Sequence, residues 1–134
     1  MQAQAIGQWS WLLPFNAVSA SAGRAQVTRI LRSAGVGQAT IDDACAVLSE
    51  LLANSVRHAR PRPDGQVLVT MVLDNASVSV AVADGGGATV PSLVHPAPLA
   101  SGGRGLGIVH TLTRHWGVRA ADEGNTVFGV LSRV

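Results

Sequence analysis

The chain has 134 residues, of which 47% are hydrophobic and 13% are charged, and its formal net charge is +2. This composition excludes a disordered chain and predicts one globular domain, residues 1–134, that buries about two-thirds of its unfolded surface. All ten basic residues are arginines, and they form neither a basic run nor an alternation with aromatic side chains, so direct nucleic-acid binding is not expected.

The first part of the chain predicts a strand and then a helix. The aromatic and apolar residues of "WSWLLPF" (9–15) are typical of a strand. Ser19 or Ser21 is expected to cap a helix that runs through "RAQVTRILRSAG" (24–35), where apolar residues recur with helical spacing. Gly35 and Gly37 end the helix.

A second helix is predicted to begin near Thr40, which forms a capping-box-like start with Asp43, and to end before the prolines at 61 and 63. The arithmetic of 100° per residue places Glu50 and Asn54 opposite the centre of an apolar stripe. That stripe consists of Ile41, Cys45, Leu48, Leu52, Val56 and Ala59.

The position and number of cysteines bear on the location of the protein. Cys45 lies on the apolar stripe, which favours a buried thiol over a reactive one. A single cysteine forms no internal disulfide, and this favours a reducing, cytoplasmic environment. No apolar run approaches the ~20 residues that cross a bilayer, so no membrane association is expected.

The second half of the chain predicts mainly strands. "QVLVTMVLD" (66–74) and "SVSVAVAD" (77–84) read as two strands, and the segment 85–103 reads as a mobile loop. A helix is predicted over 103–116, followed by a hairpin over 117–134 that turns at Gly124-Asn125. The resulting order predicts an α+β two-layer sandwich, with three helices on one face of a mixed, mostly antiparallel sheet.

Glu50, Asn54 and His58 recur at spacing four on the second helix and are neighbours on its surface. The carboxamide oxygen of Asn54 is a hard ligand suited to Mg²⁺, and a glutamate one turn away can accept a proton. Taken alone, the same residues fit a solvated polar face.

Two glycine-rich segments offer further binding groups. In "VADGGGA", Asp84 ends an apolar strand and can accept a hydrogen bond from an exocyclic amine such as that of adenine, although Asp-Gly is also an ordinary turn signal. In "SGGRGLGI", a glycine-rich loop opens directly into a helix, whose first amides favour a phosphate. With the polar helix, these segments supply the parts of a site for ATP and Mg²⁺.

The three segments together resemble the Bergerat ATP-binding fold shared by gyrase, the Hsp90 chaperone, histidine kinases and MutL. Within this superfamily the chain is most similar to the short anti-sigma-factor serine kinases of bacteria. "SELLANSVRHA" matches the N box of that family, "VADGGG" its first glycine box and "GRGLGIV" its second, and "GNTVFGVL" resembles its closing hairpin. The resemblance covers nearly the whole chain.

The resemblance implies roles for individual residues in binding the adenine base and Mg²⁺ and in catalysis. Asn54 would ligate Mg²⁺, and Glu50 would be the general base. Asp84 would read the adenine amine, while Gly86 would allow close approach of the ring. Thr126, on the last hairpin, would lie beneath the base near Asp84.

The resemblance also implies a set of phosphate contacts. Arg57 is expected to contact a phosphate, and His58 either does the same or covers the polar face of the helix. The triphosphate would be held by glycines and main-chain amides at Gly103, Arg104, Gly105 and Leu106. The chain departs from the family at Ala88, where a glycine is common, and it has no lysine in the loop 88–102, so Arg104 is the nearest substitute.

The family implies an ATP-dependent protein serine kinase that acts as an anti-sigma factor. Its partners would be a sigma factor and an anti-anti-sigma protein whose serine is phosphorylated, and a homodimer is also implied. The alternative is a non-catalytic module that binds ATP as an ordering ligand and sequesters a protein partner. Catalysis by Glu50 distinguishes the two hypotheses.

Overall fold

The computed structural model describes residues 5–87 and 103–133, apart from the side chains of 103–106. Its strands and helices follow one another in the predicted order, so the predicted α+β sandwich is confirmed. The elements are β1 (Ala5–Pro14), α1 (Ser19–Ser33), α2 (Gln38–His58), β2 (Gln66–Asp74), β3 (Ser77–Ala83), α3 (Gly103–Leu112), β4 (His115–Ala121) and β5 (Gly124–Ser132).

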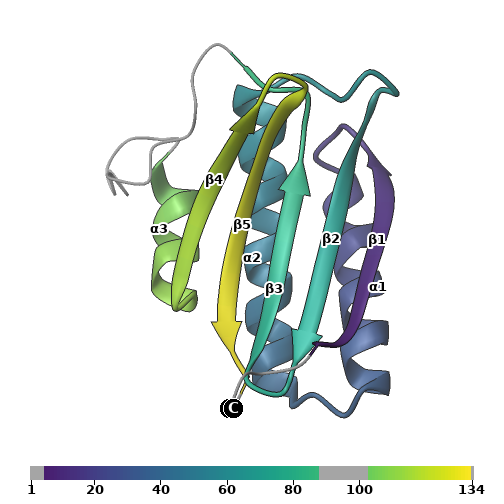
Figure 1. Cartoon of the computed structure of the whole chain (residues 1–134), viewed down its shortest axis with the longest axis vertical. Coiled ribbons are helices and arrows are strands. Elements are labelled where there is room, and N and C mark those ends of the chain that lie inside the picture. The colour runs from purple at the N-terminus through teal and green to yellow at the C-terminus, as the bar shows by residue number, and fades with distance from the viewer. Residues whose placement is uncertain (1–4, 88–102, 134) are drawn as a thin grey trace.

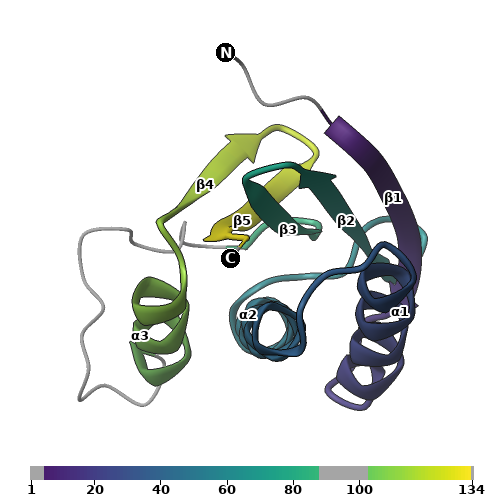
Figure 2. The same ribbon diagram turned by 90° about the horizontal axis from the view of Figure 1, so that it is seen from below.

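The strands form one sheet in the order β1-β2-β3-β5-β4, seen face-on in Figure 1. Each of the strand pairs found in the described residues is antiparallel. Figure 2 shows α1, α2 and α3 on the same side of the sheet, with α2 between the other two. The opposite side, which we call the open face, carries none of the described helices. None of the described helices is long and apolar enough to span a membrane.

The hydrophobic core lies between the sheet and the helices. Alternate residues of β2 are fully buried beneath the helices, and those between them, such as Leu68 and Val72, are half-buried on the open face. This period of two is the pattern expected of an antiparallel sheet with one covered face. The buried members on β2 are Val67, Val69, Met71 and Leu73.

Helix α2 is buried on more sides than the predicted single stripe. Asn54, placed opposite the apolar stripe by its sequence spacing, is only 3% exposed, so the alternative of a solvated polar face does not hold for this residue. The reason is that α2 contacts the sheet below and is flanked by α1 and α3 (Figure 2). Cys45 is buried as predicted.

Both predicted helix caps differ from the structure. Helix α1 begins at Ser19, and the Asn16 side chain, rather than Ser19 or Ser21, accepts a hydrogen bond from the Ser19 amide at 3.0 Å. Helix α2 begins at Gln38 after Gly37, without a side-chain cap, and Thr40 is buried within its first turn. The capping-box prediction is therefore wrong. Thr40 packs inside the protein instead of capping the helix.

The last third of the chain contains two further corrections. Helix α3 ends at Leu112 instead of continuing to residue 116, because the Arg114 amide donates to the carbonyl of Val130 and starts the β4–β5 ladder. Trp116 then packs against the core from β4. The turn between β4 and β5 consists of residues 122–123, which directly precede the predicted turn at Gly124-Asn125. Residues 88–102 of the predicted loop lie outside the described part of the chain.

Asp74 closes the turn between β2 and β3. Its Oδ1 accepts hydrogen bonds from the amides of Ala76 and Ser77 at 2.8 and 2.7 Å, and both carboxylate oxygens lie 3.1 Å from the Ser77 hydroxyl. The Ala76 amide, with the Ser77 donors and the charge of Arg114, outweighs burial and holds the pKa of Asp74 below its ordinary value of 3.8.

We expect Asp74→Ala to lower the free energy of unfolding by about 1–3 kcal/mol at pH 7, since it removes a charged acceptor of several hydrogen bonds. A lowered pKa stabilises the fold above the unfolded-state pKa, so the difference from wild type should shrink as pH falls below 3.8. Urea unfolding at pH 7 and pH 3 measures this. Asp122→Ala, on the exposed β4–β5 turn, is the control; an equal loss there would refute the assignment.

Candidate functional site

The polar residues at the end of α2 meet the residue that follows β3. Ser55, 1% exposed on α2, donates from Oγ to Oδ2 of Asp84 at 2.8 Å. The amide of Gly86 donates to Oδ1 of Asp84, also at 2.8 Å. Asp84 is 5% exposed, and a buried carboxylate requires such donors. The two bonds fix the plane of the carboxylate and leave further acceptor positions on each oxygen.

Ser55 is a functional candidate that the sequence prediction missed. Ser55 follows Asn54 directly, but residues 54 and 55 point about 100° apart on a helix. It therefore does not belong to the row of polar residues at spacing four that the sequence analysis singled out. Both residues are buried, whereas Glu50 is half-buried and His58 is exposed. Burial of two adjacent polar side chains on one helix requires polar partners on two sides of α2.

The glycines after Asp84 pack the strand end against the chain that leaves α2. The Arg60 amide donates to the carbonyl of Gly86, and the Gly85 amide donates to that of Arg60, each at 2.7 Å. A Cβ at Gly85 would collide with the carbonyl oxygen of Pro61, and Gly86 has a φ of 86°, which favours glycine. The close packing of main chain on main chain is therefore at Gly85, and the approach of a ring to Gly86 stays a prediction.

Asn125, rather than Thr126, lies on the side of the sheet that carries the Asp84 carboxylate. The Asp84 amide donates to the carbonyl of Asn125 at 2.9 Å, and Ala83 is the register partner of Thr126. Since side chains alternate across a sheet, Thr126 shares the open face with Ala83, and Asn125 shares the helix side with Asp84. Asn125 is 8% exposed, consistent with that side.

The other predicted phosphate contacts come from the ends of two neighbouring helices. Arg57 and His58 are exposed in the last turn of α2. The main chain of Gly103–Leu106 forms the first turn of α3, where amides have no partner within the helix. The side chains of Arg104 and Leu106 lie outside the described part of the chain. Figure 2 shows α3 beside α2, on the helix side of the sheet.

The donor set suits a metal that is held mainly by its substrate. Among the described residues, no group of three or more His, Cys, Asp or Glu side chains comes together. Asn54 offers one carboxamide oxygen, and Mg²⁺ commonly combines one or two protein oxygens with phosphate oxygens and water. The residues therefore fit Mg²⁺ bound together with a nucleotide phosphate.

We expect Gly85→Ala to lower the free energy of unfolding by about 1–3 kcal/mol, since its Cβ would meet the Pro61 carbonyl and push β3 away from the end of α2. Gly107→Ala is the matched control: no atom lies within 4 Å of its Cβ, and the change should stabilise α3 by about 0.5–1 kcal/mol. Thermal unfolding of both variants measures this. Two shifts of the same sign would contradict the packing role.

The comparisons with known proteins agree with this fold. The family model described as "Histidine kinase-like ATPase domain" matches residues 13–128. The crystal structure of the RsbU and RsbW domains of Rv1364c from Mycobacterium tuberculosis superposes with a TM-score of 0.71 at 22% identity. That match covers 96% of this chain and 33% of the other, so this chain spans about a third of that length. No curated protein sequence matches. The chain belongs to the histidine kinase-like ATPase domain family.

Proposed function

We propose that the chain binds ATP with Mg²⁺ beside the end of α2 and transfers the γ-phosphoryl group to a serine of a protein partner. The observation that carries this proposal is the bond from Ser55 to Asp84. This bond joins the helix that bears Glu50 and Asn54 to the carboxylate that follows β3. The chain belongs to a family of ATPase domains, which also supports the proposal.

Asp84 is the group that recognises the base. Its oxygens each retain acceptor capacity after bonding to Ser55 and Gly86, and the exocyclic amine of adenine is a donor that guanine lacks at the same position. Asn125 lies on the same side of the sheet and offers both a donor and an acceptor to the ring. A buried, oriented carboxylate discriminates strongly because a base without the amine leaves it unpaired.

The phosphates extend from the base toward the start of α3. Free amides in the turn Gly103–Leu106 and the positive end of the helix dipole favour the triphosphate. Arg57 and His58, exposed on the last turn of α2, are close enough in sequence to Asn54 to approach the same phosphates. Bound Mg²⁺ would supply charge neutralisation at Asn54.

Transfer requires a base for the attacking hydroxyl. In this proposal the serine oxygen forms a bond to the γ-phosphorus, the bond from that phosphorus to the β,γ-bridging oxygen breaks, and ADP leaves. The hydroxyl proton passes to the carboxylate of Glu50, one turn before Asn54 and half-buried. The amides of the α3 start offset charge on the moving phosphoryl group.

The resemblance to the anti-sigma-factor serine kinases supplies the partners of this proposal: a sigma factor that is bound and an anti-anti-sigma protein that is phosphorylated. The resemblance also implies a homodimer, and the single cysteine favours a cytoplasmic location. The similarity to the RsbU and RsbW domain structure supports the fold on which these expectations depend.

We expect ATP with Mg²⁺ at about 100 times Kd to raise the free energy of unfolding by ~2.7 kcal/mol. Asp84→Asn should weaken ATP binding by about 10–100-fold, since it replaces a charged acceptor. Calorimetric titration with ATP and GTP measures both affinity and base preference. Asp42→Asn, exposed near the other end of α2, should bind like wild type. Equal affinity for ATP and GTP in the wild type would remove the base-reading role.

We expect Glu50→Gln to reduce phosphoryl transfer by at least ~100-fold, because the proton acceptor is lost, while ATP affinity changes less than threefold. Asn54→Ala should instead weaken binding in the presence of Mg²⁺ and have little effect without it. Transfer from γ-labelled ATP to purified anti-anti-sigma proteins and to water measures the rates. Unchanged transfer in Glu50→Gln would exclude it as the base, and no transfer by the wild type would favour the sequestering module.

A further inference from the structure

A pocket of about 250 Å³ lies where α3 ends and β4 begins, at the lower end of both elements in Figure 1. Its lining residues are His110, Thr113, Arg114, His115 and Trp116, and we call it the α3-end pocket. On β5, the register partner of His115 is Val130, five residues from Asn125, whose carbonyl accepts from the Asp84 amide. At about 3.4 Å per residue, the pocket lies about 17 Å along the sheet from Asp84. It shares no residue with the proposed nucleotide site.

A hydrogen bond between two lining residues assigns the donor that His110 presents. The indole Nε1–H of Trp116 donates to Nδ1 of His110 at 3.4 Å. Because an indole nitrogen is a donor only, Nδ1 carries no proton in this bond, and the proton of the neutral imidazole lies on Nε2. His110 is exposed at the pocket and offers this N–H there. A metal requires an unprotonated nitrogen, so this tautomer favours an acceptor ligand over a metal.

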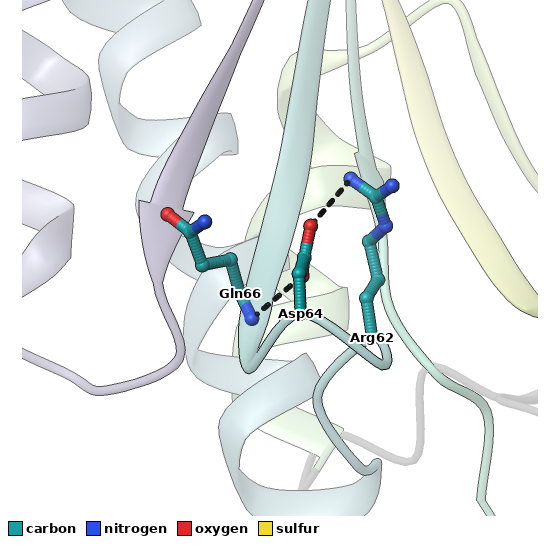
Figure 3. A network of polar contacts seen from close by, with 3 residues as sticks. All are labelled: Arg62, Asp64 and Gln66. Atoms are coloured by element: carbon teal, nitrogen blue, oxygen red, sulfur yellow. Dashed lines mark hydrogen bonds and ion pairs between the residues drawn. The ribbon is translucent and has the colours of Figure 1, made fainter.

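Arg114 brings a full positive charge to the pocket. Its main chain is fixed, because the amide donates to the Val130 carbonyl at 2.7 Å, and its side chain is exposed. Figure 3 shows the contrasting case of Arg62, whose guanidinium faces Asp64 with Nη1 3.7 Å from Oδ2. Within the described residues, Arg114 forms no ion pair of this kind. Its guanidinium is therefore open to an anion from solution.

The acidic residues at the same end of the molecule do not occupy the pocket, since none of them lines it. Asp74, whose pKa the Ala76 amide lowers most and the charge of Arg114 least, has its carboxylate bound to donors of its own turn. Asp42 accepts a hydrogen bond within α2, and Asp43 is half-buried on the same helix. The charged side chain that lines the pocket is therefore basic.

His115 adds a donor from β4. Its exposed ring meets the Phe128 ring edge-on, with the centroids 5.8 Å apart and the planes at 86°, and this contact holds the imidazole beside Arg114. A neutral imidazole offers one N–H, and a charged imidazole offers two.

The last carbonyls of α3 are the groups that oppose an anion at this position. Together they carry about half an elementary negative charge. Among them, the Val109 carbonyl already accepts from the amide and the hydroxyl of Thr113, at 3.0 and 2.6 Å. The full charge of Arg114 therefore exceeds this opposition.

We propose that the α3-end pocket binds inorganic phosphate or the phosphoryl group of a small phosphate ester. The guanidinium of Arg114 pairs with two phosphate oxygens, and the N–H groups of His110 and His115 donate to the others. The oxygens of phosphate point in several directions and meet donors from α3, from β4 and from the connection between them, whereas a carboxylate presents two oxygens in one plane. Pockets for drug-sized ligands have volumes of about 300–1,000 Å³, so this smaller volume fits one phosphoryl group rather than a whole nucleotide.

The test is an NMR titration of the whole chain with inorganic phosphate and, separately, with acetate, at constant ionic strength set by sodium chloride. We expect saturable shifts of the amides of Arg114 and His115 and of the Trp116 indole N–H, whose acceptor His110 contacts the anion. Phosphate should bind at least about fivefold more tightly than acetate. Arg114→Gln should weaken phosphate binding about tenfold or more, because it removes a charged donor pair. Arg29→Gln, which changes an exposed arginine on α1, should not.

A second variant, His110→Phe, keeps an aromatic ring but removes its N–H, and should weaken phosphate binding about fivefold. Amide spectra establish that the variants are folded, since the bond from the Arg114 amide to Val130 does not involve the side chain. Shifts confined to the amides of Gly103–Leu106 would mean that phosphate binds only the start of α3, which would support the nucleotide site and refute the α3-end pocket. Equal or tighter binding of acetate, no saturable shift, or binding that survives both substitutions would refute it as well.

Discussion

The hydrogen bond between Ser55 and Asp84 is the interaction on which the candidate site depends, because it connects the helical layer to the sheet at a buried point. The glycine segment that follows is tied to the end of α2 through Arg60, so the strand end is held from two directions. A carboxylate held in this way presents its free lone pairs in fixed directions. Preorganisation of this kind favours recognition of a fixed donor over adaptation to several ligands.

Burial of α2 sets the positions of the remaining polar groups. The helix has the sheet on one side and α1 and α3 on the others, so its polar residues differ in how far they are exposed. Glu50 is half-buried, whereas Asn54 is almost fully buried. In the proposed function, this difference in exposure would place the metal ligand Asn54 in a dry environment and leave the base Glu50 open to a protein substrate.

The sequence predicted the element order and type because its strands alternate or run apolar and its helices carry apolar residues at regular spacing. The apolar stripe did not reveal the burial of Asn54, since a periodicity argument assumes one buried face and α2 has several neighbours. The sequence prediction failed at the start of α2 because packing, which is nonlocal, outweighed the local capping signal of Thr40. Ser55 was missed because its partner Asp84 is 29 residues away, a contact that no local pattern encodes.

The prediction for Thr126 shows how much depends on a single step of register. Along β5, consecutive residues face opposite sides of the sheet, so assigning the role to Thr126 instead of Asn125 moves it from one side to the other. The same alternation holds at Ala83 and Asp84 on the neighbouring strand. Two adjacent pairs thus divide their side chains between two environments: Asp84 and Asn125 face the helices, and Ala83 and Thr126 face the opposite side of the sheet. Because the two environments share main chain, a substitution that shifts this end of the sheet must alter both.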